Sequence, residues 1–155
     1  MVDHMRKRIR DYLETQLTGL PTTGARVYAG RSRPLGAEHQ PTLLIYMRSE
    51  TSARTVMGRP PKQERPCTLF LEARVVTPDV PDDLLDGIAG ELEERMGQLI
   101  EYEPRVVVFG GLAQNCELVG TEIIAEADGK NHIGAIRLEY RVTYRVTEGA
   151  PFDAT

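Results

Sequence analysis

The chain has 155 residues and a formal net charge of −4. A chain of this length is typical of one domain that buries its own core without disulfides or metal. The acidic balance argues against a general affinity for DNA, RNA or anionic membranes, although it leaves room for local basic patches. No apolar run reaches the roughly 20 residues of a membrane span, and the basic N-terminus lacks the apolar segment of a signal peptide. We therefore expect a protein that is made in the cytoplasm and is not exported.

The first predicted element is an amphipathic helix that Asp3 can cap and that runs to about Leu17. The glycines and proline of residues 18–24 end this helix. Residues 25–31 are predicted to form a short strand and 34–41 a loop. Residues 42–49 form a second strand, whose nearly continuous apolar run predicts burial on both faces. The apolar residues of the helix fall on one side at helical spacing: Met5, Ile9, Tyr12, Leu13 and Leu17.

Residues 50–66 are predicted to form a long loop, because they contain three prolines and a glycine. A loop of this length inside a compact domain is usually functional or disordered. A solvated flexible loop is the first interpretation, docking on a protein partner the second, and contact with nucleic acid the third. No aromatic residue is interleaved to stack on bases. The basic residues of the loop are Arg54, Arg59, Lys62 and Arg65.

Residues 67–77 form the third predicted strand, and a second helix spans about 81–100. Asp79 or Asp82 can cap the start of this helix. Gly87 and Gly90 lie within it, and since glycine has no side chain, we expect them to let the helix lie close to a sheet. A connection follows, with a short extended piece at 105–109. The apolar stripe of the helix consists of Leu84, Leu85, Ile88, Leu92, Met96 and Leu99.

Residues 115–146 are predicted to close the domain as a β-hairpin around the turn signal Asp128–Gly129. A two-residue turn there pairs Val119 with Leu138 and places the apolar residues of both strands on one face. In "RLEYRVTYRV" (137–146) every second residue is apolar, so the intervening side chains point the other way. The opposite face is therefore charged. Its candidate functional residues are Glu122, Arg137, Glu139, Arg141 and Arg145.

These elements predict an α+β fold. We expect a two-layer domain, with a mostly antiparallel, mixed sheet of four to five strands and two amphipathic helices packed on one face. Burying the five apolar residues of 138–146 contributes roughly 8–15 kcal/mol, so the helices must cover that side of the sheet. We expect a single domain over residues 1–155, with a flexible C-terminal tail from about residue 147.

No catalytic motif is recognisable in the chain. Cys67 and Cys116 do not form a CxxC pair and are expected to be reduced, partly buried thiols. None of His4, His39 and His132 stands at metal-ligand spacing from another, and neither GxSxG nor a phosphate-binding glycine motif occurs. We therefore predict that the protein is not an enzyme and uses no cofactor or metal. A site assembled from distant positions stays an alternative.

Several segments carry a family pattern: "RIRDYLETQLTGL" (8–20), "ARVYAGRSRPLGAEHQPTLLIYMRSE" (25–50) and "GAIRLEYRVTYRV" (134–146). They resemble the phage tail terminator family, the proteins similar to the lambda minor tail protein U. The resemblance covers nearly the whole chain in the order of its elements. Residues 60–114 match only in layout.

The resemblance implies a structural virion protein, assembled in the host cytoplasm, that forms a hexameric ring on the head-proximal end of a siphophage tail tube. Such a ring stops tube polymerisation and presents a surface to the head-completion (connector) protein, and DNA passes through its opening. The partners implied are other copies of the chain, the tail tube protein and the head-completion protein. No cofactor, catalysis or membrane contact is implied.

In such a ring each subunit contacts its neighbours through two different surfaces. We expect the charged face of the closing hairpin to contact the neighbouring subunit or to line the lumen, with plain solvation as the alternative. We expect the loop at 50–66 to contact the tail tube. The alternatives for the whole protein are another head–tail connector or tail-completion protein of similar fold, or a small cytoplasmic enzyme or nucleic-acid-binding module.

Overall fold

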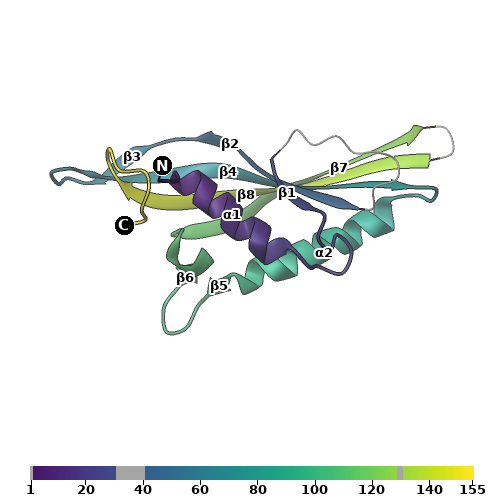
Figure 1. The fold of residues 1–155 in the computed structure, drawn as a ribbon, viewed down its shortest axis with the longest axis horizontal. Coiled ribbons are helices and arrows are strands. Elements are labelled where there is room, and N and C mark those ends of the chain that lie inside the picture. Colours follow the sequence, from purple (N-terminus) through teal and green to yellow (C-terminus); the bar gives the residue numbers. More distant parts are fainter. Residues whose placement is uncertain (1, 31–40, 129–130) are drawn as a thin grey trace.

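A computed structural model describes residues 2–30, 41–128 and 131–155 of the chain (Figure 1). The loop predicted at 34–41, with His39, lies almost entirely outside the described residues. A short 3-10 turn, Phe109–Gly111, precedes the closing hairpin. The elements are α1 (Met5–Leu17), β1 (Val27–Ala29), β2 (Thr42–Glu50), β3 (Ala53–Val56), β4 (Lys62–Thr77), α2 (Asp82–Gln98), β5 (Ile100–Glu101), β6 (Val107–Val108), β7 (Asn115–Asp128) and β8 (Asn131–Thr147).

The main sheet of the described chain has six strands, in the order β1-β2-β4-β8-β7, with β3 also paired to β4. All neighbouring strands are antiparallel except β1 and β2, which are parallel. β4 and β8 pair along their length, from Lys62 with Thr147 to Thr77 with His132. The predicted α+β class and mostly antiparallel mixed sheet are confirmed. The strand count exceeds the expected four to five because β3 lies inside the predicted loop.

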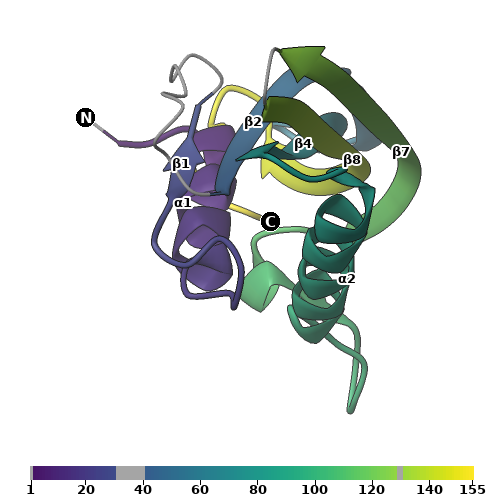
Figure 2. The ribbon, with the colours of Figure 1, turned by 90° about the vertical axis from the view of Figure 1, so that its right-hand side faces the viewer.

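Both helices pack on one face of the sheet, as predicted (Figure 2). The residue that caps α1 is His4 and not Asp3, because Nδ1 of His4 accepts a hydrogen bond from the backbone N–H of Arg6 at 3.1 Å. Asp3 instead forms an ion pair with Lys7. The apolar stripe of α1 and the apolar residues of β8 are buried in the same core: Met5, Ile9, Leu13, Leu17, Leu138, Tyr140, Val142, Tyr144 and Val146.

The start of α2 lies close to a glycine of the sheet. A Cβ at Gly134 in β8 would lie 2.9 Å from Cβ of Pro81 and 3.0 Å from Cδ1 of Leu85. The expectation for Gly87 and Gly90 is wrong, since both are exposed and a Cβ on either would have no atom within 4 Å. The close packing therefore requires a glycine on the strand and not on the helix.

The predicted loop at 50–66 is instead a β-hairpin formed by β3 and the first residues of β4. Ala53 pairs with Glu64, and Arg54 pairs with Gln63. Pro66 sits where the neighbour of β4 changes from β2 to β3, and its carbonyl accepts a hydrogen bond from the backbone of Thr51. A proline is tolerated at such an irregularity of a sheet, so it does not end β4 as the sequence suggested.

The C-terminal residues after β8, where the sequence predicts a flexible tail, form backbone hydrogen bonds with the rest of the fold. The N–H of Met5 donates to the carbonyl of Pro151 at 2.8 Å, and the N–H of Thr155 donates to the carbonyl of Arg145 at 3.1 Å. A guanidinium N–H of Arg8 donates to the carbonyl of Phe152. The last residues therefore join the start of α1 to the end of β8.

The β7–β8 pairing differs from the predicted register by two residues along most of its length. Leu138 pairs with Thr121 and not with Val119, because Asp128 lies opposite Asn131. The remainder of the predicted turn, Gly129, lies outside the described residues. From Gly120 to Glu126 this shift of two keeps each side chain on its predicted face, whereas at residues 115–118 the shift is one residue and the faces are exchanged. A bulge between Leu118 and Gly120 leaves Val119 unpaired.

Candidate interaction surface

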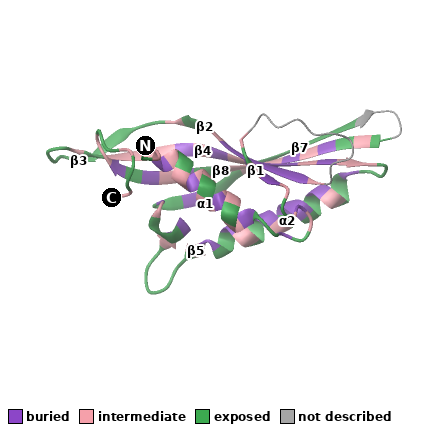
Figure 3. Ribbon diagram, in the orientation of Figure 1, coloured by how far each residue is buried: buried purple, intermediate pink, exposed green. Residues whose placement is uncertain are grey.

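The sheet face that points away from the helices, called here the outer face, carries the predicted residues of the closing hairpin. Its direction follows from the alternation along β8, where the intervening residues are buried under the helices. Figure 3 shows the same alternation of buried and less buried residues along the strands. The charged residues of the outer face are Arg137, Glu139, Arg141 and Arg145 on β8, Glu64, Glu72 and Arg74 on β4, and Glu117, Glu122 and Glu126 on β7.

Each outer-face arginine of β8 is paired with a carboxylate on a neighbouring strand. The partners lie opposite each other in the register, so the pairs form a ladder across the sheet. Exposed pairs of this kind add only about 0.2–1 kcal/mol each. The arginines are therefore largely neutralised within their own chain. The closest N–O distances are 3.1 Å for Arg137–Glu72, 3.4 Å for Arg137–Glu122, 3.1 Å for Arg141–Glu117 and 3.2 Å for Arg145–Glu64.

Glu72 is the buried member of this ladder, with 3% of its surface exposed. Its carboxylate accepts hydrogen bonds from Arg74 at 2.6 Å, Arg137 at 3.1 Å and the hydroxyl of Tyr46 at 3.0 Å. Burial acts to raise the pKa of this carboxyl, but the hydrogen bonds from Arg74, Tyr46 and Arg137 outweigh it and lower the pKa. The guanidinium of Arg137 also lies 5.4 Å from the ring centroid of Phe70.

Glu72 was not among the predicted site residues, although the sequence contains a signal for it. It is the one acid within the largely apolar segment 67–77. Only the register of β4 with β8, which places Glu72 opposite Arg137, reveals its partner.

The five predicted outer-face residues differ in how far another protein can reach them. Glu122, Arg141 and Arg145 are exposed, whereas Arg137 and Glu139 are half-buried. Within the described residues Glu139 has no ion-pair partner. Glu122, Arg141 and Arg145 are therefore the best placed to contact a partner.

The β3–β4 hairpin, residues 51–62, forms one end of the molecule (Figure 1). All residues from 51 to 60 are exposed, including the apolar Val56 and Met57. The guanidinium of Arg54 binds the carboxylate of Glu148 at 2.7 and 2.9 Å. Two further residues of the predicted basic set, Arg59 and Lys62, lie on the same hairpin. Neither has an ion-pair partner in the described part of the chain.

Arg65, the fourth predicted basic residue, does not belong to this exposed surface. Its side chain is 15% exposed, and its guanidinium lies 3.8 Å from the carboxylate of Glu50 beneath α1. Glu50 also binds Arg6 at 3.0 Å and accepts a hydrogen bond from the hydroxyl of Tyr144. Burial and the bond to Glu50 raise the pKa of Tyr144. This cluster joins α1 to β2 and β8, and its members are too far apart in sequence for a local pattern to reveal.

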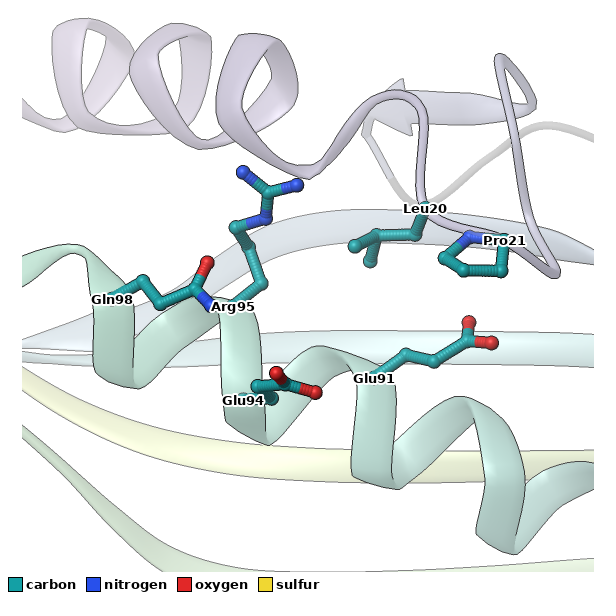
Figure 4. A pocket seen from close by; sticks show the side chains of 6 residues that line it. All are labelled: Leu20, Pro21, Glu91, Glu94, Arg95 and Gln98. Carbon is teal, nitrogen blue, oxygen red and sulfur yellow. The ribbon is translucent and has the colours of Figure 1, made fainter.

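A pocket of about 220 Å³ lies between α2 and the loop that follows α1 (Figure 4). The carboxylate of Glu91 is already used there, since it accepts a hydrogen bond from the hydroxyl of Thr22 at 2.7 Å. The contact ties the loop to α2, and the described lining residues include no serine, threonine or cysteine to act as a nucleophile. They are Leu20, Pro21, Glu91, Glu94, Arg95 and Gln98.

Cys67 and Cys116 are free, buried thiols on β4 and β7, each opposite Val142 of β8. Burial raises the pKa of each to about 12, so neither is a reactive thiolate at neutral pH. Over the described ranges no group of three or more His, Cys, Asp or Glu side chains is placed to hold a metal ion. No described helix is long and apolar enough to cross a membrane.

No protein-family model matches the chain, and no curated protein matches it. The relation to phage tail terminators therefore stays a prediction from the residues that carry it. The geometry contributes two candidate surfaces, the charged outer face and the β3–β4 hairpin.

Proposed function

We propose that the protein is a phage tail terminator, a structural virion protein that forms a ring on the head-proximal end of a long tail tube. The ring stops tube growth and provides the surface for head attachment. The observation that carries the proposal is a sheet with one face covered by helices and the other charged and partly exposed, which ends in the long edge strand β7. The resemblance of residues 8–20, 25–50 and 134–146 to tail terminators supports the same assignment.

Ring formation needs two different surfaces on each subunit, so that the same contact repeats head to tail. The sheet offers such a pair, because β7 lies at one edge and β3 lies beside β4 at the other. Both edges are available in the described part of the chain. A sheet edge presents backbone N–H and C=O groups in a row that a second chain can pair with.

The outer face fits a position at the neighbouring subunit or at the lumen of the ring. An arginine that already has a carboxylate partner neutralises a phosphate poorly, so few counterions leave the DNA and binding is weak. Arg141 with Glu117 and Arg145 with Glu64 are such pairs. A lumen lined in this way lets DNA pass without holding it.

The direct test is the mass of the purified protein in solution, by size exclusion with light scattering, with and without tail tubes assembled from the tail tube protein. A ring of six has six times the 17.3 kDa of one chain. Electron microscopy of the mixed sample should show rings on one end of each tube. A protein that stays monomeric with tubes present and leaves tube ends bare would refute the proposal.

The role of the outer face is tested by Arg141→Glu. The side chain is exposed and its pair with Glu117 is a surface pair, so the fold should lose at most about 1 kcal/mol. Loss of the ring would place Arg141 at the subunit contact, and an intact ring with poor DNA passage would place it at the lumen. Arg105→Glu, an exposed arginine beyond β5, is the matched control. If both variants match the wild type in assembly and in phage yield, the outer face has neither role.

The same samples separate the alternatives. Binding to head connectors without binding to tubes would indicate a head–tail connector or completion protein instead. A salt-sensitive shift of DNA in a gel would indicate a nucleic-acid-binding module, since phosphate contacts weaken with salt.

A further inference from the structure

Two edge segments of the sheet, the β3–β4 hairpin and β7, carry opposite charge. Residues 51–62, which form the β3–β4 hairpin, contain three basic side chains and no acidic one, and residues 115–126 of β7 contain three acidic side chains and no basic one. Glu126 of β7 and the pair Arg59 and Lys62 of the hairpin have no ion-pair partner among the described residues. Each edge therefore has charge that its own chain leaves uncompensated.

Both edges also expose apolar side chains. On β7 the exposed fractions are 40% for Leu118, 42% for Val119, 52% for Ile123 and 41% for Ile124, and on the hairpin they are 52% for Val56 and 86% for Met57. A long, exposed edge strand with apolar residues is a site where another strand adds. Burying these side chains against one another would remove apolar surface from water on both partners.

The charges decide which strand can add. Two β7 edges meeting across a two-fold axis would place glutamates against glutamates, and two hairpins would place basic residues against basic residues. Like charges across a strand pair are destabilising. The hairpin of one copy against β7 of another is the complementary combination. The two edges lie on opposite sides of β4 and β8, so one copy cannot satisfy its own.

We propose that the β3–β4 hairpin of one copy adds to the free edge of β7 of the next copy, so that the sheets continue from subunit to subunit. The contact is heterologous, so it closes into a ring or continues as a filament. The inference rests on the proposed ring and names its junction. It assigns Arg59 and Lys62 to the neighbouring subunit, in place of the tail tube contact expected from the sequence, whereas Arg54 keeps its partner Glu148.

The test uses charge reversal on each edge of the full chain. The hairpin variant is Arg59→Glu with Lys62→Glu, and the β7 variant is Glu122→Lys with Glu126→Lys. Each should keep the circular dichroism spectrum of the wild type, remain monomeric in light scattering and show an apparent dissociation constant for self-association raised roughly tenfold or more. The matched control reverses Glu94 and Arg105, which are exposed and belong to α2 and to the β5–β6 connection, not to either edge strand.

Restoration separates a true junction from damage to the fold. A chain with all four reversals should assemble like the wild type, because the signs are exchanged on both edges. The two monomeric variants, mixed in equal amounts, should also form assemblies of wild-type size. Failure of both restorations, a hairpin variant that assembles normally, or a wild type that stays monomeric at millimolar concentration in low salt would each overturn the proposal.

The outcome for the junction is distinct from the outcome for the proposed function. A hairpin variant that self-associates normally but no longer binds tail tubes would overturn the junction in favour of the tube contact. Assembly that follows the charge pattern in a protein that never caps tubes would support the junction and refute the terminator function.

Discussion

Gly134→Ala adds a single methyl group where β8 passes beneath the start of α2. The new Cβ would lie 2.9 Å from Cβ of Pro81, 3.1 Å from its Cγ and 3.0 Å from Cδ1 of Leu85. Non-bonded carbons are most stable at about 3.5–4.0 Å. The first turn of α2 must therefore move away from the sheet by several tenths of an ångström, since the ring of Pro81 has no other rotamer to adopt.

The expected cost follows from two opposing effects. Overpacking of a buried site costs about 1–3 kcal/mol, whereas replacing a glycine by alanine restricts the unfolded chain and returns about 0.4–1 kcal/mol. We expect a net loss of about 1–2 kcal/mol in the free energy of unfolding. For a domain of this size the loss lowers the melting temperature by roughly 3–6 °C.

Urea denaturation followed by circular dichroism measures the loss as a lower midpoint with an unchanged slope. Gly120→Ala is the matched control, because a Cβ at Gly120 would lie 3.4 Å from only the terminal oxygen of Glu139. This control should stay within about 0.5 kcal/mol of the wild type. A Gly134→Ala variant as stable as the wild type would show that α2 does not press on β8 at this position.

Three further predictions concern the core and the buried charges. Leu138→Asp places a charge at a fully buried position, so it should cost more than about 4 kcal/mol and abolish the cooperative unfolding transition; a variant that unfolds like the wild type would contradict this. Glu72→Gln should cost about 2 kcal/mol at neutral pH, because Arg137 loses its buried counter-charge. The pKa of Glu72 is lowered, so its stabilisation is full above the pKa of an unfolded glutamate and is lost as pH falls through the folded value; the difference from wild type in urea midpoint should therefore shrink in acid, and a constant difference would count against the network. Cys67 and Cys116 should react with iodoacetamide at pH 8 only as fast as the protein unfolds, since burial raises the pKa of both thiols to about 12; rapid labelling of the folded protein would show that they are accessible.

Much of the architecture is encoded locally and could be predicted. The helical spacing of Ile9 and Leu13 and the alternation from Leu138 to Val146 determine which side of each element is apolar. Those sides meet in one core, as expected. Because the side-chain period of a strand is two, a register error of two residues left the predicted faces of residues 120–126 of β7 correct, whereas residues 115–118, beyond the bulge, are shifted by one and lie on the opposite face.

The predicted loop at 50–66 failed for a reason that is tertiary. The prolines and the glycine in that segment predict a break in the strand. The first residues of β4 nevertheless pair with β8 on one side and with β3 on the other. The predicted site residues were likewise placed correctly where local alternation decided their position and wrongly where tertiary contacts did. Arg141 and Arg145 lie on the outer face as expected, whereas Arg65 lies in a buried cluster with Glu50.

The sequence by itself determined two amphipathic helices, a strongly two-sided closing strand and the sign of the charge along each segment, because these depend on neighbours a few residues away. Only the tertiary structure decided that Glu72 is buried beneath Arg137, that the C-terminal residues hold the start of α1, and that a basic hairpin and an acidic strand lie on opposite sides of one sheet. Those features depend on the order and register of the strands, which bring together residues that are tens of positions apart in the chain.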